Sequence, residues 1–212
     1  MKYAVAINAS PRTGWNSAML VKKAAEGAEA SGAQVDYFDL YQAEAFTGCI
    51  SCFGCKREGN LGRCIHKDGL SPILEAIEKA DGLIIGSPNY LGDLTAGFRA
   101  LYERLIFQSL SYKTDPRSYR KKKTPVLLIT TSNCPEAAYP NTGYDTMLEK
   151  YKGTLEWIIG PTKILVHGDT LQVKNYDLYN WTMFDPEAKK ARHESEFPKA
   201  LEKAFTEGYA LL

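Results

Sequence analysis

The stretch KYAVAINASPRTGWNSAMLVKKAAEGAEAS, which runs from Lys2 to Ser31, decides how the chain folds. Its first part, residues 2–8, is short and apolar and is soon followed by a Ser-Pro pair, which predicts a buried strand. In residues 16–31 the apolar side chains recur at helical spacing after Asn16, which can serve as an N-cap. The stretch therefore predicts a strand that leads through a polar loop into a helix.

The rest of the chain repeats this alternation of short apolar runs with amphipathic segments. Further strands are predicted at residues 34–39, 82–86, 125–130 and 162–167, and further helices at residues 70–79, 94–107, 144–158 and 186–208. Such an alternation is typical of an α/β fold, a doubly wound parallel sheet with helices on both faces. We expect a single five-stranded domain over residues 1–212, with a polar, basic surface loop at residues 108–123. Asp68 precedes one helix and is expected to be its N-cap rather than an acid catalyst.

Composition places the chain among ordinary globular proteins. It has 212 residues, of which 44% are hydrophobic and 24% charged, and its formal net charge is +1, so no general attraction to nucleic acid or to an anionic membrane is expected. No stretch approaches the roughly 18 apolar residues of a membrane helix, and the N-terminus is too briefly apolar for a signal peptide. We expect a cytoplasmic protein whose clustered cysteines are ligands or redox groups rather than disulfides.

Three predicted loops that follow strands are rich in small polar residues. In open parallel sheets ligands bind beyond the carboxyl ends of the strands, where such loops meet. The first loop, ASPRTGWNS at residues 9–17, offers hydroxyls, an amide, a guanidinium and the free N–H groups of a helix start, which suit a phosphate. It matches neither GxGxxG nor GxxxxGK[ST], so a monophosphate fits better than a pyrophosphate. The alternative is a capped turn that binds nothing.

The second and third loops are expected to lie beside the first. In GSPNYLGDLT, residues 86–95, Tyr90 could flank a planar ring or simply cover the core. The third loop, TTSNC at residues 130–134, carries small polar groups. Convergence of three polar loops on one edge of the sheet predicts a binding site more strongly than any single loop does.

Four of the five cysteines fall in the stretch GCISCFGCKREGNLGRC. Cys49, Cys52 and Cys55 are each separated by two residues, and Cys64 follows after eight more. Three thiolates at this spacing, with a fourth from a loop, can hold a [4Fe–4S] cluster, and soft thiolates select iron–sulfur or zinc. A zinc site, a dithiol pair and a glycine-rich loop without metal remain open alternatives.

Two motifs together, NASPRTGWNS from Asn8 and GSPNYLGDLTAGFRALYERL from Gly86, resemble the flavodoxin-like NADPH-dependent FMN reductase superfamily, in particular its iron–sulfur flavoprotein branch. The resemblance extends to about residue 170, and the chain from about residue 172 forms a C-terminal extension outside it. It implies a three-layer flavodoxin-like fold with strand order 2-1-3-4-5 and FMN bound at the three loops. The residues implicated in FMN binding are Ser10, Arg12, Asn16, Ser17, Ala18, Pro88, Asn89, Tyr90, Leu91, Gly92, Thr131, Ser132 and Asn133.

The resemblance also implies a function. FMN would accept a hydride or electrons, with NAD(P)H as a donor, and pass them to a small-molecule or protein acceptor; because the flavin carries the chemistry, no catalytic side chain is expected. The four clustered cysteines would bind [4Fe–4S] on the same carboxyl edge of the sheet as FMN, and the protein would be a homodimer or homotetramer. Two alternatives remain open: a quinone- or azo-type FMN reductase without a cluster, and a nonenzymatic nucleotide-binding regulator.

Overall fold

Parallel strands form the centre of the computed structural model, which describes residues 1–212. The strands are β1 (Tyr3–Asn8), β2 (Gln34–Asp39), β3 (Gly82–Tyr90), β4 (Asp93–Leu94), β5 (Val126–Thr131) and β6 (Thr162–His167). The helices are α1 (Asn16–Ala30), α2 (Ser71–Lys79), α3 (Ala96–Ser109), α4 (Tyr139–Thr142), α5 (Tyr144–Ile158) and α6 (Pro186–Tyr209). None of these helices combines the length and the apolar composition that a membrane crossing requires.

The sheet has the order β2-β1-β3-β5-β6, and every neighbouring pair in this order is parallel. The predicted α/β fold and its five parallel strands are therefore confirmed. The strand numbers differ from the predicted order 2-1-3-4-5 because β4 was not predicted from the sequence. β4 pairs with the end of β3 in an antiparallel hairpin. β3 is also longer than predicted, because Ser87 and Pro88 continue its pairing with β5.

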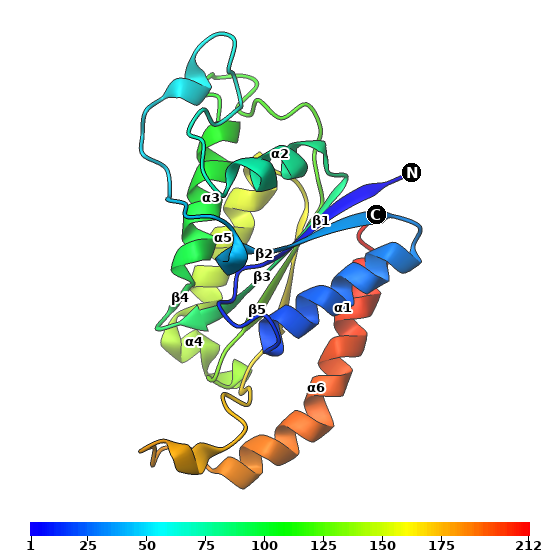
Figure 1. Ribbon diagram of the computed structural model, residues 1–212, viewed down its shortest axis with the longest axis vertical. Coiled ribbons are helices and arrows are strands. Elements are labelled where there is room, and N and C mark those ends of the chain that lie inside the picture. The colour runs from blue at the N-terminus through cyan, green and yellow to red at the C-terminus, as the bar shows by residue number, and fades with distance from the viewer.

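Helices cover the sheet on both faces, as Figure 1 shows. Side chains of α2, α3 and α5 pack on one face, and those of α1 and α6 pack on the other. Consecutive strand residues point to opposite faces, so Ile7 and Ile85 join the first core, and Ala6 and Ile84 the second. The apolar runs of the sequence are thus buried on both sides.

The long C-terminal helix α6 lies directly against α1 (Figure 1). A Cβ atom added at Gly27 would clash with the backbone of Phe205, and one added at Gly208 would clash with the backbone of Ala24. Glycine at these two crossings therefore lets the two backbones touch. This close packing fixes the C-terminal part of α6 against the second half of α1.

Candidate functional site: a cleft at the carboxyl edge of the sheet

A cleft of about 530 Å³ opens where β1, β3, β5 and β6 end. This volume lies within the range of about 300–1,000 Å³ that small-molecule sites occupy. The residues that line it are Ser10, Arg12, Trp15, Asn16, Ser17, Pro88, Asn89, Tyr90, Leu91, Thr131, Ser132, Asn133, Cys134, Tyr144, Thr170 and Gln172. The three predicted loops therefore do meet at one edge, joined by a fourth loop after β6.

All the residues predicted for FMN line this cleft except Ala18, which is fully buried beneath it, and Gly92. Trp15 and Cys134 also line the cleft and lie in two of the predicted loops, whereas Tyr144, Thr170 and Gln172 were not predicted from the sequence. Thr170 and Gln172 follow the carboxyl end of a predicted strand, residues 162–167. They could therefore have been predicted in the same way as the residues of the other loops that follow strands. Tyr144 starts a helix, and no sequence signal distinguished it.

Side-chain hydrogen bonds hold the first loop in shape. Asn8 accepts from the Ser10 N–H at 3.0 Å and donates to the Asp39 carboxylate at 2.7 Å, which ties the loop to the neighbouring strand. The Ser10 hydroxyl accepts from the Arg12 N–H at 3.2 Å. The turn after β1 is therefore fixed before any ligand arrives.

Helix α1 begins without a side-chain cap. The predicted N-cap, Asn16, is already the first helical residue; Trp15 occupies the cap position, and the Asn16 amide donates to the Leu171 carbonyl at 2.9 Å. The backbone N–H groups of Asn16, Ser17 and Ala18 donate to no group of the chain, although these residues are at most 5% exposed. Unpaired donors at the positive end of a helix dipole form a site for an anion.

The chain segment after β6 fixes the outer side of this loop. Arg12 donates to the Gln172 carbonyl at 2.6 Å, and its guanidinium lies 4.9 Å from the centre of the Trp15 ring. The Trp15 indole N–H donates to the Leu171 carbonyl at 3.1 Å. The carbonyls of residues 171–172 therefore accept hydrogen bonds from three side chains of the first loop. These bonds hold the Arg12 guanidinium at the rim of the cleft.

The second wall of the cleft is the tip of the β3–β4 hairpin. Leu91 and Gly92 both have left-handed backbones, with φ of 56° and 95°, and the Asn89 side chain accepts from the Gly92 N–H at 3.0 Å. A left-handed backbone is strained for leucine, and strain of this kind concentrates at functional sites. Tyr90 is about half exposed and Leu91 is fully exposed. The hairpin therefore presents apolar surface suited to a flat ring.

The loop after β5 closes the cleft from the third side. The hydroxyls of Ser17 and Thr131 are hydrogen-bonded at 2.7 Å, which joins the start of α1 to the end of β5. The Ser132 hydroxyl contacts the Tyr139 hydroxyl at 2.8 Å, and burial raises the pKa of Tyr139 to about 12. These contacts are buried, so this wall is rigid and polar.

The cysteine stretch was predicted to lie at this edge of the sheet, but the structure places it elsewhere. The Lys56 ammonium binds the carbonyls of Phe107, Gln108 and Leu110 at the carboxyl end of α3. The opposite end of α3 lies at the cleft edge, because its N-cap Thr95 donates to the Ala9 carbonyl in the first loop. At about 1.5 Å per residue, α3 separates its two ends by roughly 20 Å. In Figure 1 this segment (cyan) lies at the end of the molecule opposite β4.

The four clustered cysteines do not form an assembled metal site. Cys55 is buried, Cys49 and Cys64 are half-buried and Cys52 is exposed. Burial raises the pKa of the Cys55 thiol, although Lys56 partly offsets this effect. The structure gathers no group of three histidine, cysteine or acidic side chains that could hold a metal ion. Cluster binding by these cysteines therefore stays a prediction. Two larger hollows, of about 690 and 550 Å³, lie beside this segment and are lined mostly by polar and charged side chains.

A buried ion pair closes the base of the cysteine segment. Asp68 is not the N-cap of α2, a position that Leu70 takes; it pairs with Arg104 at 2.5 Å. Asp68 also accepts from the Thr47 N–H at 3.2 Å, and Arg104 donates to the His66 carbonyl at 2.7 Å. The pair thus joins the two ends of the segment to α3. The prediction that Asp68 caps the helix was wrong because the carboxylate has a stronger, buried partner that is distant in sequence.

Among curated proteins, the chain is similar to iron–sulfur flavoproteins. It is 34% identical over 100 residues to the iron–sulfur flavoprotein MJ1083 of Methanocaldococcus jannaschii, a match that covers 47% of this chain and 50% of the relative. It is 30% identical over 100 residues to the iron–sulfur flavoprotein of Methanosarcina thermophila, with the same two shares covered. The chain thus spans about half the length of the curated relatives it matches.

Solved structures match nearly the whole chain. The NAD(P)H:quinone oxidoreductase from Methanothermobacter marburgensis superposes with a TM-score of 0.69 at 14% identity, covering 99% of this chain and 96% of that one. An FMN-dependent NADH-azoreductase from Bacillus anthracis, solved with FMN, superposes with a TM-score of 0.68 at 14% identity, covering 99% of each chain. At such identities these matches show the shared fold alone.

The model of one protein family matches this chain over residues 3–137. This range contains three of the four loops that line the cleft, together with the whole cysteine stretch. Since the match covers more than half of the sequence, the chain belongs to the family described as NADPH-dependent FMN reductase.

Proposed function

We propose that the chain binds FMN in the cleft at the carboxyl edge of its sheet and acts as a flavin-dependent oxidoreductase with NAD(P)H as electron donor. The observation that carries the proposal is the set of unpaired backbone N–H groups at Asn16, Ser17 and Ala18, in residues that are almost fully buried. Buried donors without partners are costly unless a ligand satisfies them. The phosphate of FMN is such a ligand.

Each wall of the cleft has a role in this proposal. The start of α1, with the hydroxyls of Ser10 and Ser17, would hold the phosphate, and Arg12 at the rim would add positive charge. The hairpin tip with Tyr90 and Leu91 would flank the ring system and exclude water from one face. The bound flavin supplies the electron-transfer chemistry, and the chain binds, orients and shields it.

The identity of the reaction partners follows the same proposal. A quinone oxidoreductase and an azoreductase share this fold, and the family is named for an NADPH-dependent reductase. We therefore propose a small-molecule acceptor for the electrons, with residues 1–212 acting as one FMN-binding unit within a cytoplasmic homodimer or homotetramer. No part of this proposal requires an iron–sulfur cluster.

The proposal is tested by titrating the FMN-free protein with FMN and with riboflavin, followed by quenching of flavin fluorescence. We expect one FMN per chain, bound about 100-fold or more tightly than riboflavin, because only FMN carries the phosphate that satisfies the start of α1. Equal affinity for the two flavins, or no uptake of either, would contradict it.

A reduction assay distinguishes the proposed oxidoreductase from the alternative function, a nonenzymatic nucleotide-binding regulator on the same fold. Anaerobic addition of NADH or NADPH to the FMN-loaded protein should bleach the visible absorption of the flavin. A protein that binds FMN tightly but leaves it oxidised under both donors would support the nonenzymatic alternative instead.

A further inference from the structure

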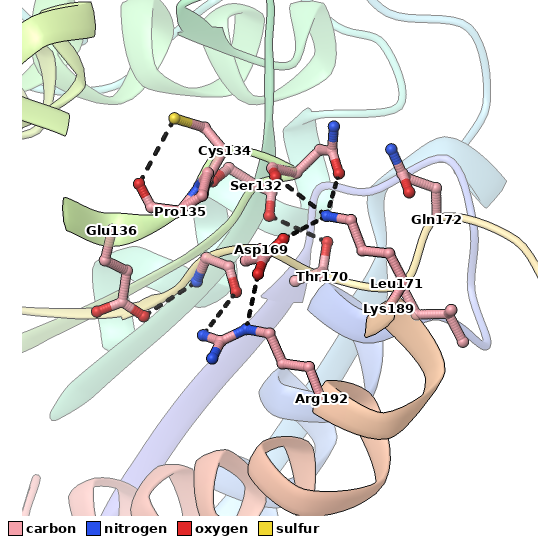
Figure 2. Close-up of polar contacts among 12 residues, drawn as sticks. Ser132, Cys134, Pro135, Glu136, Asp169, Thr170, Leu171, Gln172, Lys189 and Arg192 are labelled. Carbon is pink, nitrogen blue, oxygen red and sulfur yellow. Dashed lines mark hydrogen bonds and ion pairs between the residues drawn. The ribbon is translucent and has the colours of Figure 1, made fainter. Parts of the chain in front are cut away.

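Two of the loops that line the cleft are held together by charged side chains from α6. Figure 2 shows Lys189 and Arg192 reaching Asp169, which lies in the loop after β6. Asp169 has a left-handed backbone with φ of 52°, and its N–H donates to the Cys134 carbonyl at 3.0 Å. The loops after β5 and β6 therefore form one unit that α6 fixes from behind.

Within this unit Lys189 also binds a residue of the cleft wall. Its ammonium donates to the side-chain oxygen of Asn133 at 2.6 Å and contacts the Asn133 carbonyl at 3.3 Å. Lys189 is only 8% exposed, although lysine is rarely buried in proteins. Arg192 already neutralises Asp169, at 3.2 Å, so charge balance alone does not require a second buried cation there.

The chemistry of the two groups fixes how the Asn133 amide is turned. An ammonium only donates hydrogen bonds, so the amide atom that faces it must be the oxygen. The amide nitrogen of Asn133 then carries two N–H groups, and these donate to no other group of the chain. Because Asn133 lines the cleft, its unpaired donors are available to a ligand there.

We propose that Lys189 is a positioning residue of the flavin site: it orients the Asn133 amide so that its N–H groups donate to the nitrogen and oxygen atoms of the bound ring. This inference rests on the proposed function, since it names a ring with acceptor atoms as the ligand. A donor at this place binds the electron-rich reduced ring more tightly than the oxidised ring, so it also raises the reduction potential of the flavin.

The first test replaces Lys189 with methionine, which has similar bulk but no charge and no donor. In Lys189→Met the dissociation constant for FMN should rise about tenfold, the loss expected for one well-placed hydrogen bond from the amide to the ring, and the midpoint potential of the bound flavin should become more negative. The matched control is Lys190→Met, because the exposed Lys190 side chain pairs only with Glu187 on the surface. Its affinity and potential should equal those of the unaltered protein.

Two further variants separate orientation from simple stabilisation. In Asn133→Asp a carboxylate still accepts from Lys189, so the melting temperature should be kept or raised, yet FMN affinity and flavin potential should fall because the donors are gone. In Arg192→Met the ion pair with Asp169 is lost while the contact between Lys189 and Asn133 remains. Its melting temperature should fall with little change in FMN affinity or potential.

The outcomes divide clearly between the two proposals. If the unaltered protein takes up no FMN, the proposed function fails and this inference fails with it. If the unaltered protein binds FMN but Asn133→Asp binds it equally well at an unchanged potential, only the role of Lys189 is overturned. An equal loss of affinity in Arg192→Met and Lys189→Met would likewise overturn it, because a general loosening of the loops would then explain both.

Discussion

Replacing Arg104 with methionine is expected to lower the free energy of unfolding by about 3–5 kcal/mol. The Arg104 side chain is 1% exposed and that of Asp68 is 9% exposed, with 2.5 Å between the guanidinium and the carboxylate. Removal of the cation would leave a buried carboxylate without its partner, and the two ends of the cysteine segment would lose their common anchor. Urea denaturation followed by circular dichroism measures the change.

Two variants give this prediction its controls. Arg63→Met removes a cation whose side chain is 71% exposed and should change the stability by less than about 0.5 kcal/mol. The double variant Arg104→Met with Asp68→Leu removes both charges and should recover much of the loss, because the cost arises from the unpaired carboxylate. A single-variant loss below about 1 kcal/mol would show that the pair contributes little.

The same ion pair makes the stability sensitive to acid. Burial by itself would raise the pKa of Asp68, but hydrogen bonds from Arg104 and from the backbone of Thr47 and Leu70 outweigh it and hold that pKa below its usual value. A carboxyl group with a lowered pKa stabilises the fold above its unfolded pKa, near 4, and this stabilisation is lost as the pH falls through the folded value. The stability difference between the unaltered protein and Asp68→Asn should therefore shrink below about pH 4, as urea titrations across pH would measure.

Replacing Ser17 with aspartate is expected to weaken FMN binding by at least about 100-fold, or about 2.7 kcal/mol. The new carboxylate would lie among the unpaired N–H groups at the start of α1, where it would accept their hydrogen bonds and repel the phosphate. Riboflavin has no phosphate, so its weaker binding should change little. Titration with both flavins measures the loss of selectivity.

Ser195→Asp is the matched control for this charge change, since Ser195 is exposed on α6 and does not line the cleft. It should bind FMN like the unaltered protein. If Ser17→Asp binds FMN and riboflavin with unchanged constants, the phosphate does not lie at the start of α1, and the proposed orientation of FMN is wrong.

The sequence predicted the fold well because the fold depends on local patterns. Apolar runs such as residues 125–130 form strands close to the predicted positions because both of their faces are buried. The hairpin β3–β4 was missed because it joins residues through a two-residue turn at Leu91 and Gly92, and leucine is not a typical residue for a left-handed position.

The site was predicted only in part because its remaining contacts are long-range. The order of strands and loops places Ser10, Tyr90 and Asn133 at one edge of a parallel sheet, and the structure places them there. Nothing in the local sequence indicates that Lys189 meets Asn133 or that Arg104 meets Asp68. The cysteine segment was assigned to the wrong edge for the same reason. Strand β2 fixes where the connection to α2 starts, but the local sequence does not indicate that this connection reaches the carboxyl end of α3.

The contribution of the last part of the chain to the cleft has a practical consequence for protein engineering. Leu171 and Gln172 hold the first loop, Thr170 lines the cleft, and Lys189 turns Asn133, yet all four lie beyond residue 137, where the family match ends. A chimera that transplants residues 3–137 onto the second half of a relative would carry the first loop, residues 9–17, without the hydrogen bonds that hold it. Such an exchange succeeds only if residues 168–172 and the start of α6 are moved as well.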